Sequence, residues 1–111
     1  MEKLIINGKT FVEQPSKVSE YSIVRTFSAG VHFGIVEKRN DREVVLKDAI
    51  RIWYWDGAAS LSQLSQDGVT KPQNCKFSIA VPSIILTEAI EIIACSEKAA
   101  KCILEVPTWK V

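Results

Sequence analysis

The sequence predicts an α+β fold, in which a mainly antiparallel β-meander sheet is combined with about two helices. Short runs of β-branched and aromatic residues, separated by turn residues, are typical of antiparallel strands. Two other segments, residues 58–66 and 97–106, place apolar residues at helical spacing between start and stop signals. The chain contains no internal repeat, low-complexity tract or long linker, so we expect residues 1–111 to form a single domain.

The composition is that of a globular protein with almost balanced charge. Of the 111 residues, 47% are hydrophobic, which argues against a disordered chain. The 14 Lys and Arg residues face 13 Asp and Glu residues, so the strongly basic balance of a general nucleic-acid binder is absent. Nucleic-acid binding is therefore the less favoured function, although a local basic patch can outweigh the total charge.

The first part of the chain is predicted to form hairpins. Asn7-Gly8, between two short β-forming runs, is the strongest short-range hairpin signal. Residues 21–27 and 31–36 are rich in β-branched and aromatic side chains, and the small residues 28–30 break the run between them. These segments are expected to be two strands joined by a tight turn.

A second turn and two further strand segments complete the predicted meander. Asn40-Asp41 lies at the centre of a polar stretch, and β-forming residues follow at 44–46 and 50–55. The meander is therefore expected to extend over residues 21–55. Beyond it, the segment 58–66 is predicted to be a short helix that stops at Asp67-Gly68.

The last third of the sequence contains one clear strand pattern, one ambiguous segment and one clear helix. Residues 75–81 alternate apolar and polar side chains, as a half-buried strand does. Residues 84–94 fit both a strand and a helix, and we favour a strand at 90–95. Ser96 is a good N-cap for the helix at 97–106, which Pro107 ends.

The sequence also bears on cofactors and cellular location. Three cysteines without a Cys-x-x-Cys pair, and a single histidine, do not form a zinc-binding pattern. We expect no metal, no cofactor and no catalytic residue, and hence a protein that is not an enzyme. The N-terminal residues lack the features of a signal peptide, and no apolar run is long enough to span a bilayer. A reducing cytoplasm is the expected location.

The most unusual segment is the aromatic strand at 50–55. Because side chains alternate along a strand, Arg51, Trp53 and Trp55 are expected on one face. Such a face could stack a base or sugar ring on an indole while the guanidinium binds a phosphate. The alternative is that the two tryptophans belong to the core or to an oligomer interface.

A second candidate group lies at the first predicted turn of the meander. Ser28 and Gly30 let the backbone turn sharply and could offer N–H groups to an anion, with Arg25 as the counter-charge. The spacing is not that of a P-loop, and a hairpin connection is the alternative. His32 follows the turn, and a lone histidine in a strand is usually structural. Lys76 could close over an anionic ligand.

Several segments together resemble a family of small proteins encoded by bacteriophages and prophages. The resemblance extends from about residue 21 to the end of the chain, and it is carried by residues 25–34 (RTFSAGVHFG), 52–64 (IWYWDGAASLSQL), 75–77 (CKF) and 86–93 (LTEAIEII). In that family paired arginines often precede the Ile-Trp-Tyr-Trp run, whereas Ile50 stands before Arg51 in this chain. The departure leaves one phosphate donor fewer.

The resemblance implies a phage accessory protein in the cytoplasm of a bacterial host. Small phage proteins without catalytic residues are similar in kind to anti-defence sponges, which sequester the nucleotide signals of bacterial immunity. The implied ligand is a cyclic nucleotide or an ADP-ribose derivative, and the implied assembly is a homo-oligomer with pockets between subunits. The alternative is an inhibitor or adaptor that binds a host protein through the aromatic strand.

Overall fold

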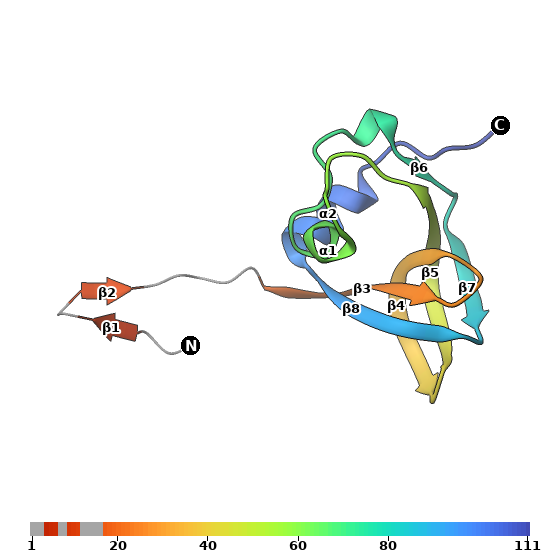
Figure 1. The fold of residues 1–111 in the computed structure, drawn as a ribbon, viewed down its shortest axis with the longest axis horizontal. Helices are drawn as coiled ribbons and strands as arrows, with labels where there is room; N and C mark the ends of the chain where they lie inside the picture. The colour runs from red at the N-terminus through yellow and green to blue at the C-terminus, as the bar shows by residue number, and fades with distance from the viewer. Residues whose placement is uncertain (1–3, 7–8, 12–16) are drawn as a thin grey trace.

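A computed structural model describes residues 4–6, 9–11 and 17–111 of the chain. Strands β1 (Leu4–Ile6) and β2 (Lys9–Phe11) form a two-stranded sheet of their own, which Figure 1 shows apart from the main sheet. The predicted Asn7-Gly8 turn lies outside the described residues. In the described strands Leu4 pairs with Phe11, Ile5 with Thr10 and Ile6 with Lys9.

The main sheet confirms the predicted meander. Strands β3 (Val18–Thr26), β4 (Val31–Asn40) and β5 (Glu43–Tyr54) pair antiparallel in chain order. A two-residue turn joins β4 to β5, and its first residue, Asp41, has a φ of 58°. Aspartate is one of the few residues that tolerate this left-handed conformation, so the Asn40-Asp41 signal has a direct physical basis.

Three shorter strands complete the six-stranded sheet. Strand β8 (Ala89–Ser96) pairs with β3 at one edge. At the other edge, β7 (Val81–Leu86) pairs with the first half of β5, and β6 (Lys76–Phe77) pairs with its second half. Residues 84–94 are thus divided between two strands, which agrees with the favoured strand at 90–95.

The predicted strand at 75–81 is wrong in its second half. After β6 the chain leaves β5, and it rejoins that strand only at Val81, so the alternation of apolar residues does not correspond to one continuous ladder. As a result Ile79 is 54% exposed instead of half-buried. In the gap, the N–H of Ser78 donates to the Arg51 carbonyl over 2.9 Å, and the Ser78 hydroxyl accepts from the Arg51 N–H over 2.8 Å.

The described residues form two α-helices, as predicted. Helix α1 (Leu61–Asp67) begins three residues later than expected because Ser60 is its N-cap, and it ends at Gly68. Helix α2 (Glu97–Leu104) is capped by Ser96, whose hydroxyl accepts from the Ala99 N–H over 3.0 Å. The 3-10 helix η1 (Pro72–Asn74) lies before β6. Within the described residues, no helix is long and apolar enough to cross a membrane.

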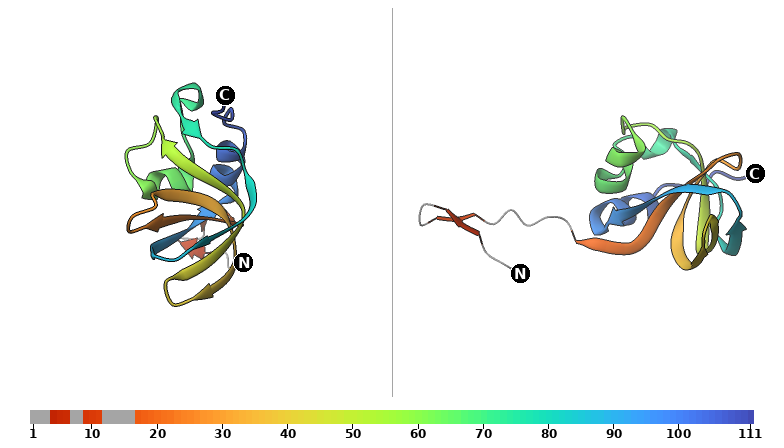
Figure 2. Two further views of the ribbon diagram at one scale, coloured as in Figure 1. Left: turned by 90° about the vertical axis from the view of Figure 1, so that its right-hand side faces the viewer. Right: turned by 60° about the horizontal axis from the view of Figure 1, so that its bottom comes forward.

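Both helices lie on the same side of the sheet (Figure 2), and each face of the sheet has its own hydrophobic core. We call these the helix-side core and the far-side core. The helix-side core consists of Ile23, Phe33, Ile52, Leu64, Val69, Cys75, Phe77, Cys95, Ala100, Ile103 and Val106. The far-side core consists of Val24, Val44, Leu46, Ala49, Leu86 and Ala89.

The far-side core is enclosed because the sheet curls strongly. In Figure 1, β3 and β8 run across the view, whereas β5 and β7 run up and down it. The curl brings the start of β8 to the turn between β4 and β5, where the Ala89 N–H donates to the Arg42 carbonyl over 3.0 Å. The Phe27 N–H donates to the Glu88 carbonyl over 2.9 Å and closes the same end.

Gly34 in the middle of β4 permits the close packing of the far-side core. A Cβ atom at this position would lie 2.8 Å from Leu46 Cγ and 2.9 Å from the Lys47 carbonyl oxygen. Both distances are far shorter than ordinary van der Waals contacts, so β4 and β5 could not keep their spacing with a larger residue here.

We expect Gly34→Val to destabilise the fold by about 1–3 kcal/mol, because the added side chain overpacks the contact with Leu46. Gly30→Asn is the matched control: an added Cβ meets nothing within 4 Å there, and asparagine tolerates the φ of +86°. Urea denaturation followed by circular dichroism measures both free energies. Equal stabilities of the two variants would contradict the role of Gly34.

The Ser96 cap is expected to matter more than the Ser60 cap. The buried Ser96 hydroxyl accepts from Ala99 and also donates to the Gln66 carbonyl over 2.7 Å, whereas Ser60 is exposed. We expect Ser96→Ala to cost about 1–2 kcal/mol and Ser60→Ala about 0.5–1 kcal/mol. The midpoints of chemical denaturation test this order, and a larger loss for Ser60→Ala would refute it.

Candidate functional site

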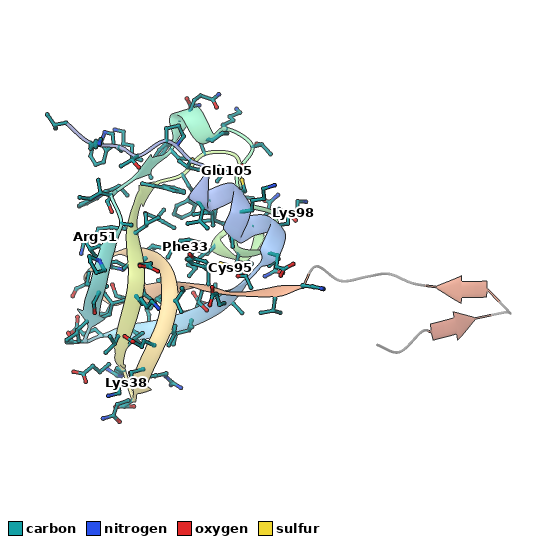
Figure 3. All side chains as sticks on the ribbon, turned by 180° about the vertical axis from the view of Figure 1, so that it is seen from behind. Phe33, Lys38, Arg51, Cys95, Lys98 and Glu105 are labelled. Carbon is teal, nitrogen blue, oxygen red and sulfur yellow. The ribbon has the colours of Figure 1, made fainter. Side chains whose placement is uncertain are left out.

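A hollow of about 230 Å³ opens on the sheet face opposite the helices, where β5 changes its partner from β7 to β6. Figure 3 shows Arg51 on the side of the sheet away from α2, with Phe33 and Cys95 on the side of the helix. We call this the Arg51 hollow. It is lined by His32, Ala49, Arg51, Trp53, Ser78, Ile79, Val81 and Ile84.

A larger groove of about 590 Å³ lies between β3 and α2. Its lining combines exposed apolar residues such as Val18 and Leu104 with the charged side chains of Glu97, Lys101 and Glu105. The charged groups that line it are solvent-exposed. The Arg51 hollow, although smaller, contains a buried polar side chain and is therefore the better candidate for specific recognition.

His32 is that buried side chain. It is 1% exposed, and its Nε2 atom accepts a hydrogen bond from Nε of Arg51, its cross-strand neighbour, over 3.1 Å. Burial, and secondarily the positive charge of Arg51, lower the pKa of His32 to about 4. The imidazole is therefore neutral at pH 7. Since Nε2 accepts, the proton is on Nδ1, an atom with no hydrogen-bond partner in the described part of the protein.

The guanidinium of Arg51 is held in place but not neutralised. Its Nε is fixed by His32, and its central carbon lies 5.7 Å from the centre of the Trp53 ring. Across residues 17–111, the side-chain ion pairs are Arg25 with Glu91 and Lys98 with Asp67, so neither includes Arg51. The hollow therefore contains a positive charge that has no carboxylate partner within residues 17–111.

The expectation that Arg51, Trp53 and Trp55 share one face is wrong for Trp55. Between β5 and β6, Ile52 pairs with Phe77 and Tyr54 pairs with Lys76, so the ladder shifts by one residue at Trp53. The shift breaks the alternation, and both Trp53 and Tyr54 are exposed, by 59% and 51%.

Trp55 consequently faces the helices. Its ring packs against the helix-side core, and its Nε1–H donates to the Ala58 carbonyl over 3.2 Å. The core alternative considered for the two tryptophans thus describes Trp55, whereas Trp53 lines the hollow.

Trp109 was not predicted as a site residue, yet it lies against Trp53. The two ring centres are 6.4 Å apart with the planes at 72°, an edge-to-face contact. The N–H of Trp109 donates to the Phe77 carbonyl over 2.8 Å, which places the C-terminal segment beside β6. Nζ of Lys76 lies 5.3 Å from the centre of the Trp109 ring. Lys76 is thus connected to Trp53 through Trp109, and no local sequence pattern indicates that Trp109 lies beside β6.

The remaining predicted residues belong to the hairpin between β3 and β4 and do not line the hollow. Nε of Arg25 lies 3.0 Å from Oε1 of Glu91, and the Ser28 hydroxyl donates to Oε1 of Glu88 over 2.6 Å. The Ala29 N–H donates to the Thr26 hydroxyl over 2.8 Å, and the Thr26 N–H donates to the Gly30 carbonyl over 3.0 Å. These contacts are those of a hairpin connection, which was the alternative to an anion-binding turn.

The cysteines lie outside the hollow. All three are free thiols, and Cys75 and Cys95 are buried. Burial raises the pKa of Cys95 to about 12, so this thiol is protonated at neutral pH. Among the residues that the structure describes, no three His, Cys, Asp or Glu side chains are grouped so that they could hold a metal ion.

Comparisons with known proteins give a family but no activity. Neither a curated protein nor a solved structure matches the chain. Residues 19–103 match a family described as a domain of unknown function, DUF6948. The matched segment includes the six-stranded sheet from the second residue of β3 onward, nearly all of α2, and the hollow residues His32, Arg51 and Trp53, whereas Trp109 lies beyond it. The chain therefore belongs to the DUF6948 family.

Proposed function

We propose that this protein binds a nucleotide in the Arg51 hollow without reacting with it. The observation that carries the proposal is the guanidinium of Arg51, fixed between buried His32 and exposed Trp53 with no carboxylate partner in the described residues. A phosphate group would supply the missing negative charge, and the indole face would stack a base or sugar ring.

The biological role in this proposal is sequestration. The resemblance to phage-encoded proteins supports a cyclic nucleotide or an ADP-ribose-type signal of bacterial immunity as the ligand, held in the cytoplasm of the host. Tight binding of such a signal would suffice for an anti-defence sponge, since removal of the free ligand is itself the effect.

Binding without chemistry is supported by the state of His32. A histidine that acts as a general base needs a free ring nitrogen within reach of the proton that it abstracts. Nε2 of His32 already accepts from Arg51, and Nδ1 carries the proton. The imidazole therefore positions the guanidinium rather than acting as a base.

The proposal includes self-association. The Arg51 hollow measures about 230 Å³, below the 300–1,000 Å³ of typical ligand pockets. Apolar side chains around it remain exposed, Ile79 by 54% and Trp109 by 50%. A second copy packed over them would enlarge the hollow into a pocket between subunits.

Binding of a host protein is the second candidate function. The exposed side chains of Trp53, Tyr54 and Trp109 favour it, because tryptophan, tyrosine and arginine are enriched at the centres of protein interfaces. In that case the same surface would bind a protein partner instead of a nucleotide.

Nucleotide binding is expected to raise the melting temperature of the wild-type protein, because the ligand binds the folded state alone. The probes are 3′,5′-cyclic AMP, cyclic di-AMP, cyclic ADP-ribose and AMP at concentrations up to 1,000-fold above a micromolar Kd, where the stabilisation reaches about 4 kcal/mol.

Two variants test the place of binding. Arg51→Gln is expected to remove the thermal shift, whereas Arg25→Gln, which deletes an arginine outside the hollow, is expected to preserve it. Absence of a shift with every probe would reject nucleotide binding in favour of a protein partner. A shift that survives in Arg51→Gln would place the site elsewhere.

The buried His32 predicts that the fold weakens in acid. Its pKa is about 4 in the folded protein, against 6.5 for an ordinary histidine, so the unfolded chain binds the proton more readily between these values. The contribution of neutral His32 to the free energy of unfolding is fully present above pH 6.5. It is lost as the pH is lowered toward 4, which reduces the free energy of unfolding by up to about 3 kcal/mol.

The measurement compares urea denaturation of the wild type and His32→Gln at pH 7.5, 6, 5 and 4. Other groups titrate in both proteins, so the difference between the two profiles isolates His32. We expect the wild type to lose stability faster than the variant below pH 6.5. Parallel profiles would show that His32 is not held neutral.

A further inference from the structure

We infer that the ligand carries two negatively charged groups on either side of a stacked ring, so that a dinucleotide with two phosphates fits this protein better than a mononucleotide. The inference rests on the proposed function and specifies its ligand class. It comes from four side chains in contact, in the order Arg51, Trp53, Trp109 and Lys76, which we call the cation–indole row.

At each end of the row a cation makes a cation–π contact with an indole ring. The guanidinium carbon of Arg51 lies 5.7 Å from the Trp53 ring centre, and Nζ of Lys76 lies 5.3 Å from the Trp109 ring centre. Both distances are within the range in which a cation is attracted by the aromatic quadrupole. The two indoles meet edge to face between them, at 6.4 Å.

Neither cation has a carboxylate partner within residues 17–111. The carboxylate of Asp56, two residues after Tyr54, accepts from Nδ2 of Asn74 over 2.9 Å. Two positive charges are therefore separated by the double indole and remain available to anions.

The alternation of side chains along β5 and β6 puts both cations on a single face. Ile52 and Phe77 pair with each other and belong to the helix-side core, so their strand neighbours Arg51 and Lys76 lie on the other side of the sheet. The hydrogen bond from Trp109 to the Phe77 carbonyl then places the second indole beside the first. The two cations thus come from the adjacent strands β5 and β6, and Trp109 of the C-terminal segment lies between Lys76 and Trp53.

The spacing of charges selects the ligand. A mononucleotide presents its negative charge at one place, which Arg51 in the hollow would bind without a contribution from Lys76. A dinucleotide presents a base next to two phosphates, and it can engage both cations while the base lies on an indole. The second phosphate contact should then lower the Kd at least tenfold, as one additional charge-assisted hydrogen bond does.

Isothermal titration of the full chain at 150 mM salt tests the inference, with AMP and 5′-phosphorylated diadenylate as probes. We expect the diadenylate to bind the wild type at least tenfold more tightly than AMP. Lys76→Gln should reduce the affinity for the diadenylate about tenfold and leave that for AMP within twofold. Lys101→Gln removes the same charge from α2, on the other side of the sheet, and should change neither Kd.

The outcomes separate the inference from the function on which it rests. Equal affinities of the wild type for AMP and the diadenylate would overturn the two-phosphate inference while nucleotide binding stands. An equal loss of both ligands in Lys76→Gln would overturn it too, because Lys76 would then serve a single phosphate site. Failure of both probes to bind the wild type would overturn the two-phosphate inference, whereas nucleotide binding itself is rejected only if the cyclic probes also give no thermal shift.

Discussion

The arrangement of the whole domain depends on the way in which β5 is paired. One edge of this twelve-residue strand is covered by β4, but the other is shared by two short strands, β7 and then β6. Neither reaches Arg51, whose backbone N–H and carbonyl are satisfied by Ser78 alone. A continuous partner strand would fill this gap and leave no hollow, so the same break that interrupts the ladder creates the candidate site.

The two faces of the sheet differ in how completely they are covered. The helix side contains the larger core, with Phe33 and Ile103 among its buried residues. The far side is filled by small and branched residues only at the end near β7 and β8, so its other end remains open around Arg51 and Trp53. The helix-side core and the candidate site therefore use different residues, and changes to Arg51 or Trp53 should leave the helix-side packing intact.

The features that could be predicted from the sequence are those fixed by short-range chemistry. The turn at Asp41 and the helix cap at Ser96 each depend on a few neighbouring residues, and both were found. The mistakes concern long-range pairing: the end of β6 at Phe77, the shift at Trp53 that turns Trp55 toward the helices, and the return of Trp109 to β6. Each depends on which strand edge is free in the folded protein, a property that no local pattern contains.

The separation of the three tryptophans between the two faces gives the protein built-in optical probes. Trp55 is part of the helix-side core and donates to Ala58, so its emission should report on the packing of that core. Trp53 and Trp109 are exposed, touch each other and each lie beside a cation, so their emission should respond to occupancy of the site. Replacing Trp55 with phenylalanine would leave the surface pair as the chromophore, and folding and binding could then be followed separately in unlabelled protein.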